Sequence, residues 1–299
     1  MTLLRIAFFE LRILFYSKRG LLASGLYALT GFMAATGYFI LNQELDNQIQ
    51  KASEQEGLSF SVALNAADYA RSELYQGFMG FCSGLPIEQI NTAIMGTPIF
   101  AILLWALSWI LPTLILLTTY DVLSSPLASH TFRFETFRAS RLEILLGRLL
   151  AHCGQFILGL LLIAIIAIFA LWSEETIGLF QGEHTFQSFL IFLINILTIG
   201  VTYCALIFLG SVLSPSNRGA LFLCALLLTL ISSGPTVMAW QWGEDNTLVQ
   251  LFSHLSPTHF THKLWHASLK EFGYGLLAYG SLFTLYLGAT YIIFSRKNL

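Results

Sequence analysis

The chain has 299 residues, of which 56% are hydrophobic and only 11% are charged, and its formal net charge is −2. About a quarter of the residues of a soluble globular domain are charged, so the composition excludes that class. The near-neutral balance also excludes a basic nucleic-acid-binding protein.

Six apolar stretches are long enough to cross a bilayer as helices. A hydrocarbon core about 30 Å thick requires about 20 residues at 1.5 Å of rise per residue. We therefore predict an all-α integral membrane protein in which residues 1–299 form one transmembrane domain. The predicted spans are residues 20–41, 98–120, 149–172, 186–213, 220–240 and 272–294.

Residues 1–19 are predicted to form a helix that lies in the membrane surface. Arg5, Arg12 and Arg19 recur every seven residues, so they drift only slightly around one helix face. Leu and Phe fill most of the remaining positions, and this pattern is typical of the cytoplasmic headgroup boundary. A cytosolic extension of the first span is the alternative interpretation.

Basic residues gather on one side of the predicted membrane. If the N-terminus is cytoplasmic, the only Lys and Arg residues outside are Lys51, Arg71, Lys263 and Lys270. This is the positive-inside pattern, and it predicts that both termini are cytoplasmic.

Residues 42–97 form the largest external segment, which is acidic. Its Ala-rich stretch at 61–70 predicts a helix. The Gly-rich stretch at 77–86 predicts a break. Nothing in the segment has catalytic spacing.

Residues 121–148 form the main cytoplasmic loop. We predict a helix that starts near Ser129 and alternates aromatic with charged residues: Phe132, Arg133, Phe134, Glu135, Phe137 and Arg138. Short amphipathic helices of this kind dock into grooves on other proteins. The alternative is a loop of ordinary solvated charges. The aromatic content favours docking, because exposed Phe side chains need a protein or lipid partner.

Four histidines cluster within residues 254–266. On a helix, His259, His262 and His266 would share one face, and three imidazoles can bind zinc or copper. However, Lys263 replaces the glutamate of a zincin motif, so we predict no metal site here. Histidines at the edge of a span are the preferred interpretation.

Two functional features are absent from the sequence: a nucleotide-binding P-loop and charged residues in the middle of the spans. It has no Gly-Lys dipeptide and therefore no P-loop, so it cannot hydrolyse ATP itself. No Asp, Glu, Lys or Arg lies near the middle of a predicted span, which argues against ion-coupled transport.

Three segments resemble the ABC-2-type permease family, the membrane subunits of ATP-driven exporters. Residues 8–20, FFELRILFYSKRG, resemble that family's elbow helix. Residues 137–150, FRASRLEILLGRLL, resemble its stretch that runs from the coupling helix into the third span. Residues 254–260, HLSPTHF, resemble the segment before its last span.

The resemblance implies a six-span permease that forms a translocation path in the bacterial cytoplasmic membrane. It implies pairing with a second permease copy or paralogue and with cytosolic P-loop ATPase subunits, which carry the ATP and Mg²⁺. The implied coupling residues are Phe132, Arg133, Phe134, Glu135, Phe137, Arg138, Arg141 and Glu143.

Two other functions stay open at this point. One is a non-transporting scaffold that binds a periplasmic partner through residues 42–97. The less favoured one is an intramembrane metal-dependent enzyme that uses the histidines of residues 254–266. The Phe, Leu and Gly content of the spans favours a hydrophobic or amphipathic cargo.

Overall fold

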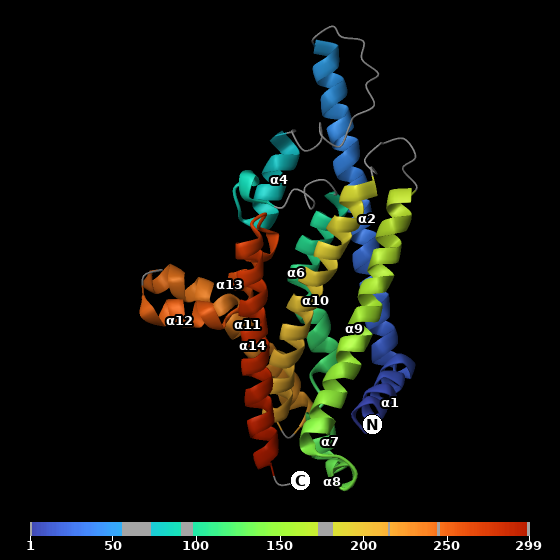
Figure 1. The fold of residues 1–299 in the computed structure, drawn as a ribbon, viewed down its shortest axis with the longest axis vertical. Helices are drawn as coiled ribbons and strands as arrows, with labels where there is room; N and C mark the ends of the chain where they lie inside the picture. The colour runs from blue at the N-terminus through green and yellow to red at the C-terminus, as the bar shows by residue number, and fades with distance from the viewer. Residues whose placement is uncertain are drawn as a thin grey trace.

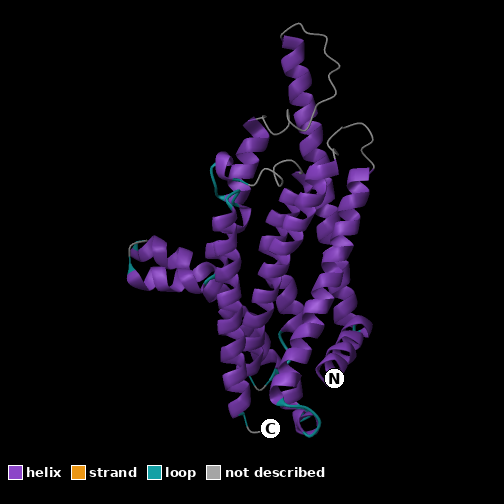
Figure 2. Cartoon of the chain, in the orientation of Figure 1, coloured by secondary structure: helices purple, strands orange, loops and turns teal. Residues whose placement is uncertain are grey.

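The computed structural model describes residues 2–55, 73–90, 98–172, 182–214, 216–243 and 246–297. These residues are helical apart from short connections, and no named strand occurs among them (Figure 2). Six of the helices are long and apolar enough to cross a membrane, and each coincides with one predicted span. The all-α membrane class is thus confirmed.

The six long helices carry most of the chain. They are α2 (Lys18–Gln55), α6 (Pro98–Thr119), α9 (Arg141–Trp172), α10 (Gly182–Leu213), α11 (Asn217–Trp242) and α14 (Leu269–Arg296). The shorter elements are α1 (Thr2–Tyr16), α4 (Glu73–Ser83), α7 (Ser124–Ala128), α8 (Phe132–Thr136), α12 (Thr247–Leu255) and α13 (Pro257–Phe260), with 3₁₀ turns η1 (Ile87–Gln89) and η2 (Thr261–Trp265).

Helix α10 lies at the centre of the bundle and packs against α6, α9, α11 and α14. Helices α1 and α2 both pack against α9. The two chain termini, α7 and α8 lie at the same end of the bundle, which we call the terminal end, and α4 lies toward the opposite, far end (Figure 1). Apolar side chains of α6, α9 and α10 make the largest contributions to the core.

A sharp junction separates α1 from α2. Ser17 Oγ donates a hydrogen bond to Leu14 O (2.8 Å) and accepts one from Gly20 N (2.9 Å), so it caps the start of α2. A Cβ atom at Gly20 would lie 1.8 Å from Leu14 O, so only glycine fits at this turn. The junction lets α1 lie against α9 as a separate helix.

Glycine also permits the contact between α1 and α9. A Cβ atom at Gly147 would lie 2.8 Å from Ile6 Cγ2, so a larger residue would push the two helices apart. That α1 lies in the membrane surface stays a prediction.

Several predicted boundaries differ from the structure. Helix α2 continues past the predicted end of its span as far as Gln55, and α9 begins at Arg141, inside the predicted loop. Helix α4 continues through Gly77 to Ser83, so the chain breaks within the predicted 77–86 stretch but near its far end. The chain turns at Gly84, whose φ is +66°. The helix predicted at 61–70 lies outside the described residues.

The prediction of a single helix that starts near Ser129 is also wrong. Two short helices, α7 and α8, take its place, and the turn between them contains His130 with a φ of +56°. A left-handed residue cannot continue an α-helix, so His130 separates the two helices.

Helix α11 is the least covered of the long helices. Only 11% of its apolar window is buried within the chain. Helix α12 packs against it, and α12 projects from the side of the bundle beside α14 (Figure 1).

Candidate functional site

The start of α9 is fixed by a reciprocal cap. Ser140 donates from its backbone N to Glu143 Oε2 (2.8 Å), and Glu143 N donates to Ser140 Oγ (3.2 Å). This is a capping box, which satisfies donors that the first turn of a helix leaves unpaired. The carboxylate of Glu143, a predicted coupling residue, is therefore engaged in starting α9.

Arg141 joins the start of α9 to the end of α14. Its Nη1 donates to the carbonyl oxygens of Phe294 (3.1 Å) and Lys297 (3.0 Å), and also to that of Ser295. The last turn of a helix has unpaired carbonyls and carries the negative end of the helix dipole, so it attracts a cation.

Arg148 is the centre of the terminal end, with 5% of its surface exposed. Its Nη2 lies 3.0 Å from Glu10 Oε1 on α1 and 2.9 Å from Glu135 Oε1 on α8. Its Nη1 donates to the carbonyl of Val122, which follows α6. One guanidinium thus connects α9 to α1, to α8 and to the end of α6.

Phe132 holds α8 from a second side. It is 1% exposed, and its ring meets the Phe294 ring of α14 edge-on at a centroid distance of 5.0 Å. The guanidinium carbon of Arg148 lies 4.9 Å from the centroid of the Phe132 ring. A cation over an aromatic face adds electrostatic attraction to the packing. Helix α8 is thereby attached to both α9 and α14.

The predicted coupling residues therefore fall into two groups. Phe132, Glu135, Arg141 and Glu143 make contacts within the chain, as described above. The outward group consists of Arg133, Phe137 and Arg138, whose side chains are exposed, Phe137 by 86%. The side chain of Phe134 lies outside the described part of the structure. Of the coupling residues whose side chains are described, the outward group is the part that is exposed to another protein.

The three arginines predicted to form one stripe do not share a helix. Arg5 and Arg12 lie on α1 and are exposed, whereas Arg19 belongs to α2 beyond the Ser17 junction, and its side chain is not described. Large apolar side chains near Arg5 and Arg12, such as Phe8 and Phe9, are also exposed.

Glu10 and Arg148 were not among the predicted site residues. Burial raises the pKa of the Glu10 carboxyl above its usual value, and the nearby Arg148 opposes that rise in part. A signal was present in the sequence, because each is a charged residue within a strongly apolar segment.

The predicted histidine face does not form. Helix α13 ends at Phe260 and a 3₁₀ turn follows, so His259, His262 and His266 do not line one α-helical face. His266 instead accepts a hydrogen bond from Ser268 N through Nδ1 (3.0 Å). Within the described ranges, no group of three or more His, Cys, Asp or Glu is placed to hold a metal ion.

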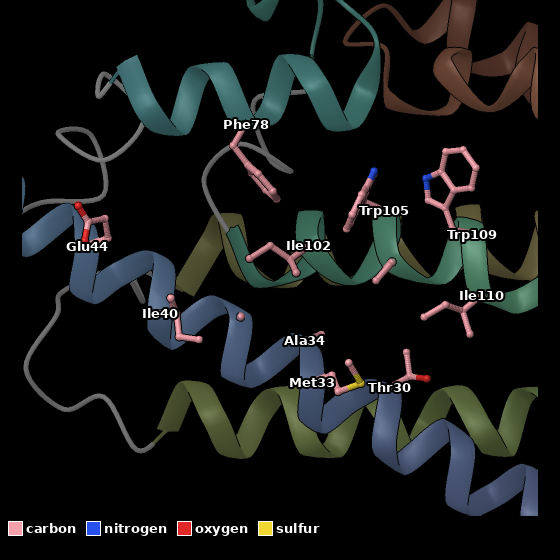
Figure 3. A pocket seen from close by; sticks show the side chains of 12 residues that line it. Thr30, Met33, Ala34, Ile40, Glu44, Phe78, Ile102, Trp105, Trp109 and Ile110 are labelled. Carbon is pink, nitrogen blue, oxygen red and sulfur yellow. The ribbon is translucent and has the colours of Figure 1, made fainter.

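A second candidate site is an apolar pocket of about 650 Å³ between α2, α4 and α6. Phe78 points from α4 toward the cavity, and Trp105 and Trp109 of α6 line it (Figure 3). The Phe78 and Trp105 rings lie edge-to-face at 6.5 Å. Glu44 lies at one end beside Ile40 (Figure 3). The lining suits apolar and aromatic groups, with one carboxylate at the edge.

Comparison with known proteins gives one match. The family model described as "ABC-2 family transporter protein" matches residues 4–299. The matched range contains both the contacts of Arg148 and the apolar pocket. The search of curated proteins finds no match.

Proposed function

Because the match over residues 4–299 makes the chain a member of the ABC-2 family of transporter proteins, we propose that it is the permease of an exporter driven by separate cytosolic ATPases. Membership makes it a multi-pass membrane subunit of a transporter, not itself catalytic. Our proposal adds the direction of transport, the docking surface and the way movement is transmitted.

The outward group at the terminal end, Arg133, Phe137 and Arg138, is proposed to contact the ATPase. Exposed arginine and aromatic side chains next to one another are typical anchors of protein interfaces. Their placement on and just after α8 supports this, because α8 is attached to the bundle from its other side.

The observation that carries the proposal is the set of Arg148 contacts. When ATP and Mg²⁺ bring the two ATPase subunits together, the outward group would be displaced, and α8 with it. Since Glu135 and Phe132 both contact Arg148, the movement would pass to α9 and α1. The Phe132–Phe294 contact would pass it to α14.

The orientation follows from charge. The terminal end carries both chain termini and α8 (Figure 1), and the positive-inside pattern assigns these segments to the cytoplasm. We propose the bacterial cytoplasmic membrane, with a second permease copy or paralogue completing the path.

The apolar pocket is proposed as a contact site for cargo. Three aromatic side chains, Phe78, Trp105 and Trp109, give a large apolar contact area toward the far end. This supports a cargo with a hydrophobic part, in keeping with the apolar spans.

The proposal is tested on the complex purified from native membranes. The double variant Phe137→Ala/Arg138→Ala should weaken ATPase association by more than about tenfold, because interface anchors each contribute about 2 kcal/mol or more. Arg218→Ala is the matched control, since Arg218 is exposed at the other turn of the terminal end.

Association is measured by the amount of ATPase that co-purifies, and coupling by ATP-dependent transport in proteoliposomes. Unchanged association and unchanged transport in the double variant would show that the outward group is not the docking surface. A purified complex that contains no ATPase would contradict the function itself.

No described residue of the 42–97 segment adds an observation in favour of a scaffold. The described histidines of residues 254–266 likewise add none in favour of a metal-dependent enzyme. A periplasmic accessory protein stays a prediction.

A further inference from the structure

The apolar pocket between α2, α4 and α6 follows one face of each of its two long helices. On α2 its lining runs from Thr30 to Glu44, and on α6 it runs from Ile102 to Ile110, with the spacing of a helix face. The pocket is therefore a groove along the two helices. Its use by cargo rests on the proposed function, and the chemical group that it holds is a separate question.

The pocket lies within one half of the bilayer. The candidate span of α2 is Gly20–Ile40, and Thr30 is at its centre. From Thr30 to Ile40 the helix rises about 15 Å, which is half of a hydrocarbon core about 30 Å thick. The α6 lining likewise reaches from near the far-end start of α6 to its middle (Figure 1). The pocket thus has the depth of the lipid leaflet at the far end.

One side of the pocket is open at the level of the span. Met33, Ile40 and Trp109 line it and are exposed, Trp109 by 73%. Ala34 and Ile102 also line it but are buried, so they form its floor. Because the bilayer core contains no water, an apolar opening at this depth faces the hydrocarbon chains of lipids.

The lining provides mainly apolar contact. Thr30 Oγ1 donates to Leu26 O of its own helix (2.9 Å), so this hydroxyl is already paired. Glu44, at the end of the pocket, has an interaction of its own within the chain. The volume of about 650 Å³ is in the range of small-molecule sites. The lining therefore favours a slender apolar occupant over a polar headgroup.

Aromatic contacts hold one wall of the pocket in place. The centroid of the Trp105 ring lies 6.5 Å from that of Phe78 and 6.2 Å from that of Phe81, and both phenylalanines belong to α4. Phe78 also points toward the cavity (Figure 3). On the α2 side, a Cβ atom at Gly37 would meet nothing within 4 Å, so a small residue leaves room there. The space is formed by the fold itself.

We propose that the apolar pocket binds one acyl chain of a lipid from the leaflet at the far end. The chain lies along α2 and α6 over the depth from Ile40 to Thr30, and the headgroup stays at the membrane surface beyond Ile40. An acyl chain is the apolar group that this leaflet supplies at this depth, and the open side admits it without passage through water. For the proposed permease, the cargo is then an acylated amphiphile that moves sideways between α2 and α6.

The test is photo-crosslinking of the full-length chain in bilayers that contain a phospholipid with a diazirine in the middle of one acyl chain. Mass spectrometry of peptides locates the adducts. We expect residues 33–40 and 102–110 to carry about fivefold more adduct than exposed apolar positions outside the pocket in the same half of the bundle, Ile168 and Leu277. No ATP or ATPase subunit is present, so failure here is distinct from the absence of an ATPase in the native complex.

A variant that fills the pocket tests the site itself. Gly37→Leu should lower the adducts in the pocket about fivefold, because overpacking of a filled space is unfavourable. Gly280→Leu on α14 is the matched control, since a Cβ atom at Gly280 also meets nothing within 4 Å and Gly280 does not line the pocket. Thermal unfolding of both variants shows whether the fold is kept.

Three results would overturn the proposal. The first is labelling of the pocket that only equals that of Ile168 and Leu277, as expected for lipid at any exposed surface. The second is weaker labelling than at those positions, which would show that a second copy of the chain covers the opening. The third is unchanged labelling of the pocket in Gly37→Leu.

Discussion

The contacts within the terminal end differ in kind from those that form the apolar pocket. At the terminal end, Arg141 and Arg148 make directional, charge-assisted hydrogen bonds to four other elements or their ends. The pocket near the far end is lined almost entirely by aliphatic and aromatic side chains. Hydrogen bonds weaken steeply when their geometry changes, whereas apolar contacts tolerate repacking. The first region is therefore suited to passing movement on, and the second to accommodating varied molecules.

The largest effect is expected from Arg148→Met, which removes the charged contacts that distinguish the terminal end from the apolar pocket. The variant leaves Glu10 and Glu135 without their cation in a partly buried place, and we expect a loss of about 3 kcal/mol in the free energy of unfolding. Chemical unfolding in mild detergent measures it. Arg296→Met, at an exposed arginine of α14, should change stability by less than about 0.5 kcal/mol. Equal effects of the two variants would show that the buried contacts of Arg148 contribute no more to stability than an exposed arginine does.

A smaller effect is expected from Arg141→Ala. The last turn of α14 loses a donor shared by three carbonyl groups, which corresponds to about 2 kcal/mol for hydrogen bonds to a charged group. Hydrogen exchange should therefore speed up in the last turn of α14, with little change around Trp105. The control is Arg138→Ala, a nearby exposed arginine. Unaltered exchange in α14 would contradict the assignment of Arg141.

Trp105→Ala tests the role of the apolar pocket in the same comparison. We expect the cargo concentration that half-maximally stimulates the ATPase to rise about tenfold, because an aromatic contact in a binding pocket contributes about 1.4 kcal/mol or more. Trp240→Ala is the control, since Trp240 is 91% exposed and lies on α11. If Trp105→Ala instead abolished coupling at saturating cargo, the division of roles between the two regions would be wrong.

The smallest effect concerns pH and Glu10. Burial raises the pKa of Glu10 in the folded chain, so the folded state binds its proton more tightly than the unfolded state does. Stability should be highest below the ordinary value of about 4.5 and fall as the pH rises through the raised pKa. Glu10→Gln should remove this slope, and Glu88→Gln should keep it. Arg148→Met should steepen it, because Arg148 opposes the rise. A slope that persists in Glu10→Gln would assign it to another group.

The long helices could be predicted because a membrane imposes one simple requirement, an apolar run of sufficient length. Their ends depend on local chemistry instead. The start of α9 at Arg141 follows from the capping box of Ser140 and Glu143, whose spacing is visible in the sequence. The predicted loop extends to residue 148, where the apolar run begins, because that prediction was based on hydrophobicity and not on the capping box.

The contacts of the candidate site depend on positions far apart along the chain. Glu10 and Arg148 meet only because Gly147 lets α1 approach α9. Arg141 meets its acceptors only when α14 lies beside α9. The outward position of Phe137 was expected, but the buried position of Phe132 was not, because an alternating pattern does not say which face packs. The apolar pocket requires α2, α4 and α6 together, so no local pattern could predict it.

The bonds from Arg141 to the last turn of α14 have a consequence for biosynthesis. The ribosome completes α9 well before α14, so Arg141 waits for its acceptors while the intervening helices are inserted. A chain truncated or stalled before α14 lacks the acceptors that this guanidinium has in the folded chain. The Arg141 contacts can therefore form only after α14 has been inserted beside α9.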